Sequence, residues 1–96
     1  MTAFIATLKV SNEKAGTFEK LQTELSELAH AQEPDMFVYD VIKSRDNPGT
    51  YVVYARFKDQ RAFDHHMNID FHDRLVPPIL ECLDEEMQLE MFDHVA

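Results

Sequence analysis

Tryptophan is absent from this sequence of 96 residues, and cysteine occurs once, at Cys82. A single cysteine excludes an internal disulfide and any zinc site built on paired cysteines. With only two glycines and four prolines, the chain contains no collagen-like or low-complexity segment. We therefore expect one folded domain over residues 1–96, with a small core that lacks the crosslinks common in small domains.

Basic residues are also scarce, because nine Lys and Arg stand against 18 Asp and Glu, which gives a formal net charge of −9. A negative charge of this size repels nucleic acid and anionic lipid surfaces, so we expect neither as a partner. No run of roughly 18 apolar residues occurs, and the first residues lack the features of a secretion signal. Together with the lone cysteine, these features predict a cytoplasmic protein without a membrane span.

Four segments carry the period-two alternation of strands: residues 3–10, 36–44, 50–58 and 87–92. The turn-forming residues 45–49 connect the second and third segments and predict a hairpin. Large side chains occur on both faces of these strands. In the second strand we place Phe37, Tyr39 and Val41 on one face and Val38, Asp40 and Ile42 on the other.

Helical periodicity separates the strands. After Ser11 and Asn12, which we expect to cap a helix, apolar residues repeat at spacings of three and four until Pro34 ends the pattern. A second helical region covers residues 59–83, with an expected break near residues 68–70. The Pro77-Pro78 pair is expected to kink or restart this region, because proline lacks the amide donor.

The predicted order β-α-β-β-α-β in so short a chain indicates an α+β, ferredoxin-like fold. This fold has a four-stranded antiparallel sheet with helices on one face. The other sheet face also carries apolar residues, and nothing in the chain is left to cover it. We therefore expect a homodimer in which two copies pack their sheets together about a two-fold axis.

Scattered residues of the chain resemble the pattern of the antibiotic biosynthesis monooxygenase (ABM) family. They are Glu33-Pro34-Asp35, Tyr39, the turn from Ser44 to Pro48, Tyr54, Phe57-Lys58-Asp59, Ala62 and His66. The resemblance covers nearly the whole chain and implies a single ABM-like domain that forms a dimeric α+β barrel. The chain differs from the family where Ala55 and Phe57 occupy the positions of a common Glu and Trp.

The resemblance also implies an activity. It is the monooxygenation, by dioxygen and without metal, flavin or haem, of a phenolic, quinol or polycyclic aromatic small molecule. Two other functions stay open. One is proton transfer in a small carbonyl compound by an isomerase on the same fold. The other is a non-catalytic small-molecule-binding dimer, which the family differences at Ala55 and Phe57 favour.

His66 is the first choice for a catalytic residue. It lies on the apolar stripe of the second helical region with Phe63 and Met67, where a neutral imidazole can act as a general base. The alternative is a buried histidine that merely hydrogen-bonds a carbonyl group. Tyr39 is the expected donor that stabilises an anion developing on the substrate.

The predicted substrate contacts fall into two groups, apolar and polar. The apolar group could line a cavity for a flat ring, and the polar group could hold a phenolate or carboxylate oxygen. They are Phe57, Phe63, Met67 and Phe71 in the first group, and Tyr54, Arg56 and His72 in the second. By alternation, a cavity on the helix side would include Tyr39 and Phe57 and leave Tyr54 and Arg56 to the dimer interface.

A metal site is the remaining alternative for the histidine-rich region. His65, His66, Asp70, His72 and Asp73 could ligate a divalent cation if the helix break brought them together. His65 and His66 are adjacent and point in different directions on a helix, and no pair shows the His-x3-His spacing that would place two imidazoles on one face. We therefore expect no metal.

Overall fold

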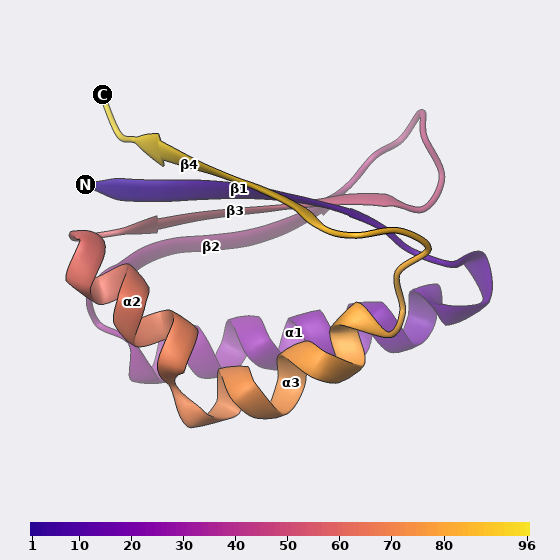
Figure 1. Cartoon of the computed structure of the whole chain (residues 1–96), viewed down its shortest axis with the longest axis horizontal. Coiled ribbons are helices and arrows are strands. Elements are labelled where there is room, and N and C mark those ends of the chain that lie inside the picture. Colours follow the sequence, from indigo (N-terminus) through magenta and orange to yellow (C-terminus); the bar gives the residue numbers. More distant parts are fainter.

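Four strands form one antiparallel sheet in the computed structural model, which describes all residues, 1–96. They are β1 (Thr2–Lys9), β2 (Met36–Lys43), β3 (Thr50–Phe57) and β4 (Gln88–Asp93), in the spatial order β2-β3-β1-β4. The helices α1 (Ala15–Gln32), α2 (Gln60–Asn68) and α3 (Asp70–Leu80) all lie on one side of this sheet (Figure 1). The ferredoxin-like α+β fold is thus confirmed, with the element order β-α-β-β-α-α-β.

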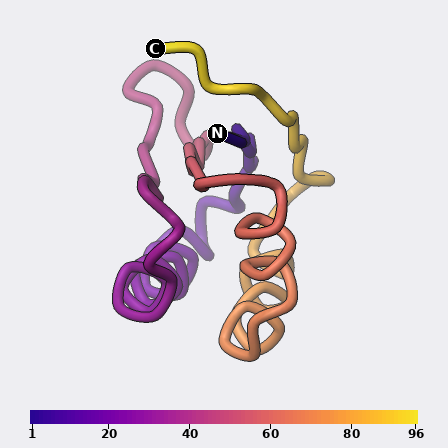
Figure 2. Tube along the Cα trace, turned by 90° about the vertical axis from the view of Figure 1, so that its left-hand side faces the viewer, coloured from indigo at the N-terminus to yellow at the C-terminus, as the bar shows by residue number.

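The helices form one layer beneath the sheet, in two rows that lie side by side. Figure 2 shows α1 under one half of the sheet and α2 with α3 under the other half. Alternate residues of β3 face these helices and are buried, among them Tyr51 and Phe57. Residues of β3 between them, such as Tyr54 and Arg56, face away from the helices and are only half-buried. The core therefore lies between one sheet face and the helices.

The break in the second helical region lies where it was predicted. Ile69 has an extended backbone, with φ −74° and ψ 146°, and separates α2 from α3. Asp59 caps α2 by accepting a hydrogen bond from the Ala62 amide at 2.9 Å. A restart at the prolines is not observed, because α3 runs through Pro77 and Pro78. The carbonyl groups that these prolines leave without a partner belong to exposed residues, which water can hydrate.

The start of the first helix differs from the prediction. Ser11 makes no capping hydrogen bond, and its hydroxyl donates to the Asp84 carboxylate. A short 3-10 turn, Asn12–Lys14, precedes α1. The link between Ser11 and Asp84 fastens the end of β1 to the segment that leads into β4, so the hydroxyl serves tertiary structure and not helix capping.

A β-bulge changes the predicted facing of β2. The register between β2 and β3 shifts between Met36 and Val38. As a result Phe37 is 44% exposed whereas Tyr39 is 4% exposed. The prediction that these two residues share a face was therefore wrong, since the bulge adds one residue to the strand.

The sheet face opposite the helices is covered by no part of the chain. On β4, Phe92 pairs with Ala3, belongs to this face and is accessible, whereas Leu89 and Met91 alternate with it and are turned to the helix side. Ile42 on β2 is accessible as well.

None of the helices combines the length and the apolar character needed to cross a bilayer.

Candidate functional site

The most unusual feature of the interior is a buried pair of ionisable side chains. His66, in the last turn of α2, places Nδ1 2.8 Å from Oε2 of Glu33, the residue that caps the C-terminus of α1. His66 is 1% exposed and Glu33 4% exposed. Groups of this kind are rarely buried unless they are paired, and here each is the partner of the other.

Glu33 occupies a position that is electrostatically unfavourable for a carboxylate. It follows the last turn of α1, where the helix dipole presents partial negative charge. Its backbone is fixed, because its amide donates to the Ala29 carbonyl and its own carbonyl accepts from Met36. Its Oε1 is buried without a hydrogen-bond partner. Stability alone does not explain such a placement, which is typical of functional sites.

The pair defines how His66 can act. An ionised Glu33 only accepts hydrogen bonds, so Nδ1 of His66 carries the proton and donates it to Oε2. This contact is the one hydrogen bond of the imidazole ring, and Nε2 is left with a free lone pair. Because His66 lines an internal cavity, this lone pair is available to a molecule inside it.

That cavity lies between the sheet and the helices α1 and α3. It has a volume of about 80 Å³, and 12 of its 15 lining residues are hydrophobic. An apolar cavity of about 150 Å³ binds benzene, so a ring enters here only if side chains move. Met67, Leu80 and Leu89 line the cavity and are also partly exposed, which places them at its mouth.

Two further ionisable groups line the cavity beside His66. The phenol of Tyr39 bonds to Oε1 of Gln22 at 3.4 Å. Burial, and then the charge of Glu33, raise the pKa of Tyr39, so its hydroxyl stays protonated as a donor. His72 stacks edge-on against His66 with 4.9 Å between ring centroids. Burial lowers the pKa of His72, and so does repulsion from His66 whenever that ring is protonated; both favour the neutral form of His72.

The structure brings together some of the predicted site residues and separates others. His66, Tyr39, Met67 and His72 line the cavity. Phe57 packs against His66 with 5.3 Å between ring centroids, and Phe63 packs against Phe57 at 5.6 Å, but neither Phe57 nor Phe63 lines the cavity.

The other three predicted contacts lie away from the cavity surface. Phe71 is buried in the core of the fold without lining the cavity. Tyr54 and Arg56 are on the uncovered sheet face, where Arg56 Nη1 lies 3.0 Å from Nε2 of His94. Their position matches the alternation of β3, which sends Tyr54 and Arg56 to one face and Phe57 to the other.

The histidine-rich region does not form a metal-ligand cluster. No group of three or more His, Cys, Asp or Glu side chains in residues 1–96 is arranged to hold a metal ion. His65 is exposed on α2, whereas its neighbour His66 points into the core.

Sequence reasoning missed two residues of the site. Glu33 was considered only as part of a helix-ending motif and Gln22 was not singled out, yet both are buried. The Glu-Pro pair was itself a signal, because it fixed Glu33 at the end of α1. Its partner, 33 positions later, could not be inferred from spacing.

Comparison with known proteins agrees with this fold. The family model Antibiotic biosynthesis monooxygenase matches residues 1–76. A candidate antibiotic biosynthesis monooxygenase from Caulobacter crescentus is 28% identical, with a TM-score of 0.95, over 99% of this chain and 90% of that chain. Another structure described as an antibiotic biosynthesis monooxygenase is 28% identical, with a TM-score of 0.91, over 100% of both chains.

A conserved protein from Methanosarcina mazei Go1 is 26% identical, with a TM-score of 0.90, over 95% of this chain and 89% of that chain. No curated protein gives a significant sequence match. The family match nevertheless extends from β1 into α3 and includes both Glu33 and His66. By sequence and by fold alike, the chain belongs to the antibiotic biosynthesis monooxygenase family.

Proposed function

We propose that this protein is a cofactor-independent monooxygenase of a phenolic or quinol small molecule. The observation that carries the proposal is the imidazole of His66, which is fixed by Glu33 on one side and open to an apolar cavity on the other. A fixed base in a water-poor site suits the first step of such a reaction, which is removal of a proton from a hydroxylated ring.

In this step Nε2 of His66 accepts the proton of the substrate hydroxyl. The imidazolium that forms is stabilised by the carboxylate of Glu33, which already accepts a hydrogen bond from Nδ1. Tyr39 exchanges its long hydrogen bond to Gln22 for one to the substrate oxygen as negative charge develops there. His66 therefore acts as the general base, Glu33 as the carboxylate that orients it, and Tyr39 as the hydrogen-bond donor that stabilises the anion.

Oxygen chemistry follows on the substrate itself. The anion passes one electron to dioxygen, and the resulting substrate radical and superoxide combine into a carbon-bound peroxide. The peroxide takes the proton from His66. Cleavage of its O–O bond, with loss of the remaining hydrogen on that carbon, leaves a carbonyl group and releases water. The substrate thus loses its hydroxyl hydrogen and one ring C–H hydrogen and becomes a quinone, while O₂ supplies one oxygen to the product and one to water, so the four electrons balance without an added reductant.

The size of the cavity bears on the substrate. A single phenolic ring requires the mouth residues Met67, Leu80 and Leu89 to move apart, and a polycyclic ring requires a larger displacement. Methionine and leucine at a partly exposed mouth can change rotamer at low cost, which supports entry of one ring.

The test is oxygen uptake with hydroxylated aromatic substrates. Replacing His66 with Ala is expected to lower turnover at least about 100-fold, the usual contribution of a general base. The matched control is His65→Ala, since His65 is the adjacent histidine but is exposed on α2. Equal turnover by His66→Ala and His65→Ala, with both variants folded by circular dichroism, would reject the assignment.

One observation favours a second candidate function. The cavity volume of about 80 Å³ is closer to a small carbonyl compound than to an aromatic ring. With the same base, His66, the protein would then be an isomerase that moves a proton between carbon atoms. Turnover of an enolisable ketone without oxygen consumption would select this function over oxygenation.

The proposal includes a homodimer. Members of this family are typically dimeric. The uncovered sheet face and the exposed Ile42 and Phe92 support packing against a second copy. Light scattering on the purified chain is expected to give twice the monomer mass, and Ile42→Lys is expected to shift the equilibrium toward monomer. A monomer at high micromolar concentration would remove this part of the proposal.

A further inference from the structure

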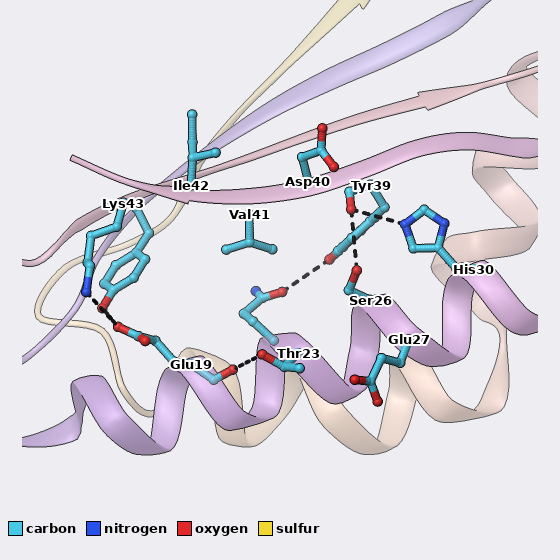
Figure 3. Close-up of a pocket in the computed structure, with 12 residues that line it drawn as sticks. Glu19, Thr23, Ser26, Glu27, His30, Tyr39, Asp40, Val41, Ile42 and Lys43 are labelled. Carbon is cyan, nitrogen blue, oxygen red and sulfur yellow. Dashed lines mark hydrogen bonds and ion pairs between the residues drawn. The ribbon is translucent and has the colours of Figure 1, made fainter. Parts of the chain in front are cut away.

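A second pocket lies on the other side of the cavity wall. It is a polar groove of about 500 Å³ between α1 and the edge strand β2 (Figure 3). This volume falls within the range of roughly 300–1,000 Å³ that is usual for ligand pockets. Asp40 and Ile42 are among the lining residues, but Figure 3 shows their side chains pointing away from α1. The chemistry of the groove therefore comes from α1, from the alternate residues of β2 and from Tyr51 of β3.

The groove and the cavity share a wall made of two side chains. Gln22 on α1 and Tyr39 on β2 are the two residues that line both spaces. They meet through the hydrogen bond between the Tyr39 hydroxyl and Gln22 Oε1 (Figure 3). At 3.4 Å this bond is at the long, weak end of the range. A single weak contact therefore separates the groove from the space beside His66.

The backbone behind this wall is held by the pairing of β2 with β3 and by two contacts from α1. The Tyr39 carbonyl accepts a hydrogen bond from Ser26 Oγ at 3.4 Å and contacts Nε2 of His30 at 3.3 Å. Both come from α1, so they tie the strand edge to the helix on each side of the gap. Opening of the wall thus requires rotation of Gln22 or Tyr39 and no movement of β2.

The groove contains one carboxylate that is neutralised by an ion pair and one that is not. Glu19 and Lys43 neutralise each other in an ion pair at 3.3 Å. Glu27 lines the outer rim of the same groove, with its carboxylate on the side of α1 away from β2 (Figure 3), and takes part in none of the ion pairs of the chain. One carboxylate is therefore available to a ligand, and it favours a cationic hydrogen-bond donor over an anionic group.

We propose that the groove binds the amine-bearing arm of a ligand whose phenolic ring occupies the cavity beside His66, and that Gln22 and Tyr39 form the gate between the two parts. The position of the ring rests on the proposed function. A two-part site also makes the small cavity compatible with a larger ligand, since only one ring needs to enter the cavity while the rest of the molecule lies in the groove.

The experiment compares three phenols that differ at the end of one arm: tyramine, 4-ethylphenol and 3-(4-hydroxyphenyl)propanoate. Affinities are measured by calorimetry without dioxygen, so binding is separated from turnover. Tyramine is expected to bind roughly fivefold more tightly than 4-ethylphenol, as for one partly exposed charge pair, and the propanoate more weakly. Glu27→Gln is expected to abolish this preference. The matched control Glu24→Gln removes the same charge from α1 outside the groove and is expected to retain it.

The outcomes separate this inference from the proposed function. Equal affinity of the wild-type protein for all three phenols would leave the ring site intact and overturn the groove. Failure of every phenol to bind would overturn the ring site and the inference with it. A crystal structure with tyramine decides the route: the ammonium is expected beside Glu27 with Gln22 rotated away, and an arm that leaves past Met67 and Leu80 would contradict the gate.

Discussion

Two glutamates near opposite ends of α1 form hydrogen-bonded pairs with very different surroundings. Glu33 is buried and bonds His66 at 2.8 Å, whereas Glu19 lies at the surface and accepts bonds from Tyr51 at 2.5 Å and Lys43 at 3.3 Å. The short contact at Glu19 is the more conspicuous, yet water screens it. The buried pair is more consequential, because removal of one partner leaves the other desolvated and unpaired.

The largest expected effect follows from breaking the buried pair. Glu33→Ala removes the acceptor of the His66 Nδ1 proton, and loss of a buried hydrogen bond to a charged group costs about 1.5–3 kcal/mol of unfolding free energy. Glu19→Ala, the matched surface change on the same helix, is expected to leave stability nearly unchanged. Urea unfolding of the two variants measures this difference. Equal losses would show that burial does not distinguish the two pairs.

A smaller effect on folding stability is expected at acidic pH from His72, which packs against His66. The pKa of His72 is lowered by burial and by His66, although Asp73 and Glu33 act in the opposite direction. Because the folded state binds this proton less readily than the unfolded state, stability due to His72 is present above a pH of about 6.5 and is lost as the pH falls.

The comparison is between wild type and His72→Gln across a pH series of unfolding curves. The variant is expected to show a shallower loss of stability between about pH 6.5 and pH 5. Parallel curves for the two proteins would show that His72 does not titrate differently on folding.

The smallest effect is expected at the surface pair. Burial, and then the hydrogen bond to Glu19, raise the pKa of Tyr51 to about 12. In Glu19→Gln the pKa of Tyr51 is expected to fall yet stay above about 10, because burial is the larger cause. Ultraviolet absorbance of the phenolate measures this titration. An unchanged midpoint in the variant would show that the carboxylate contributes nothing.

Much of the fold could be predicted from local patterns in the sequence. The alternation of β3 and the spacing of Phe71, Leu75 and Ile79 indicated the buried faces, since periodicity reports directly on burial. The bulge after Met36 could not be predicted, because a bulge leaves no regular trace in the pattern. The helix through Pro77 also departed from a local rule, since exposed carbonyl groups tolerate the missing donor.

The site was predictable only in part, for a different reason. His66 was found from its place on an apolar stripe, where an ionisable residue is conspicuous. Glu33 was not found, because its role depends on a tertiary contact between the ends of two helices. The cavity could not be sized in advance either, since its volume depends on how Met67 and Leu89 pack at its mouth.

The most direct test of the account is the protonation state of the His66 ring. Nitrogen-15 NMR of the histidines at neutral pH, with His66→Ala to assign the signal, distinguishes the two ring nitrogens. The account predicts a neutral ring that carries its proton on Nδ1 and has a free Nε2. A ring protonated on Nε2 alone, or on both nitrogens, would contradict the assignment of His66 as a base held ready by Glu33.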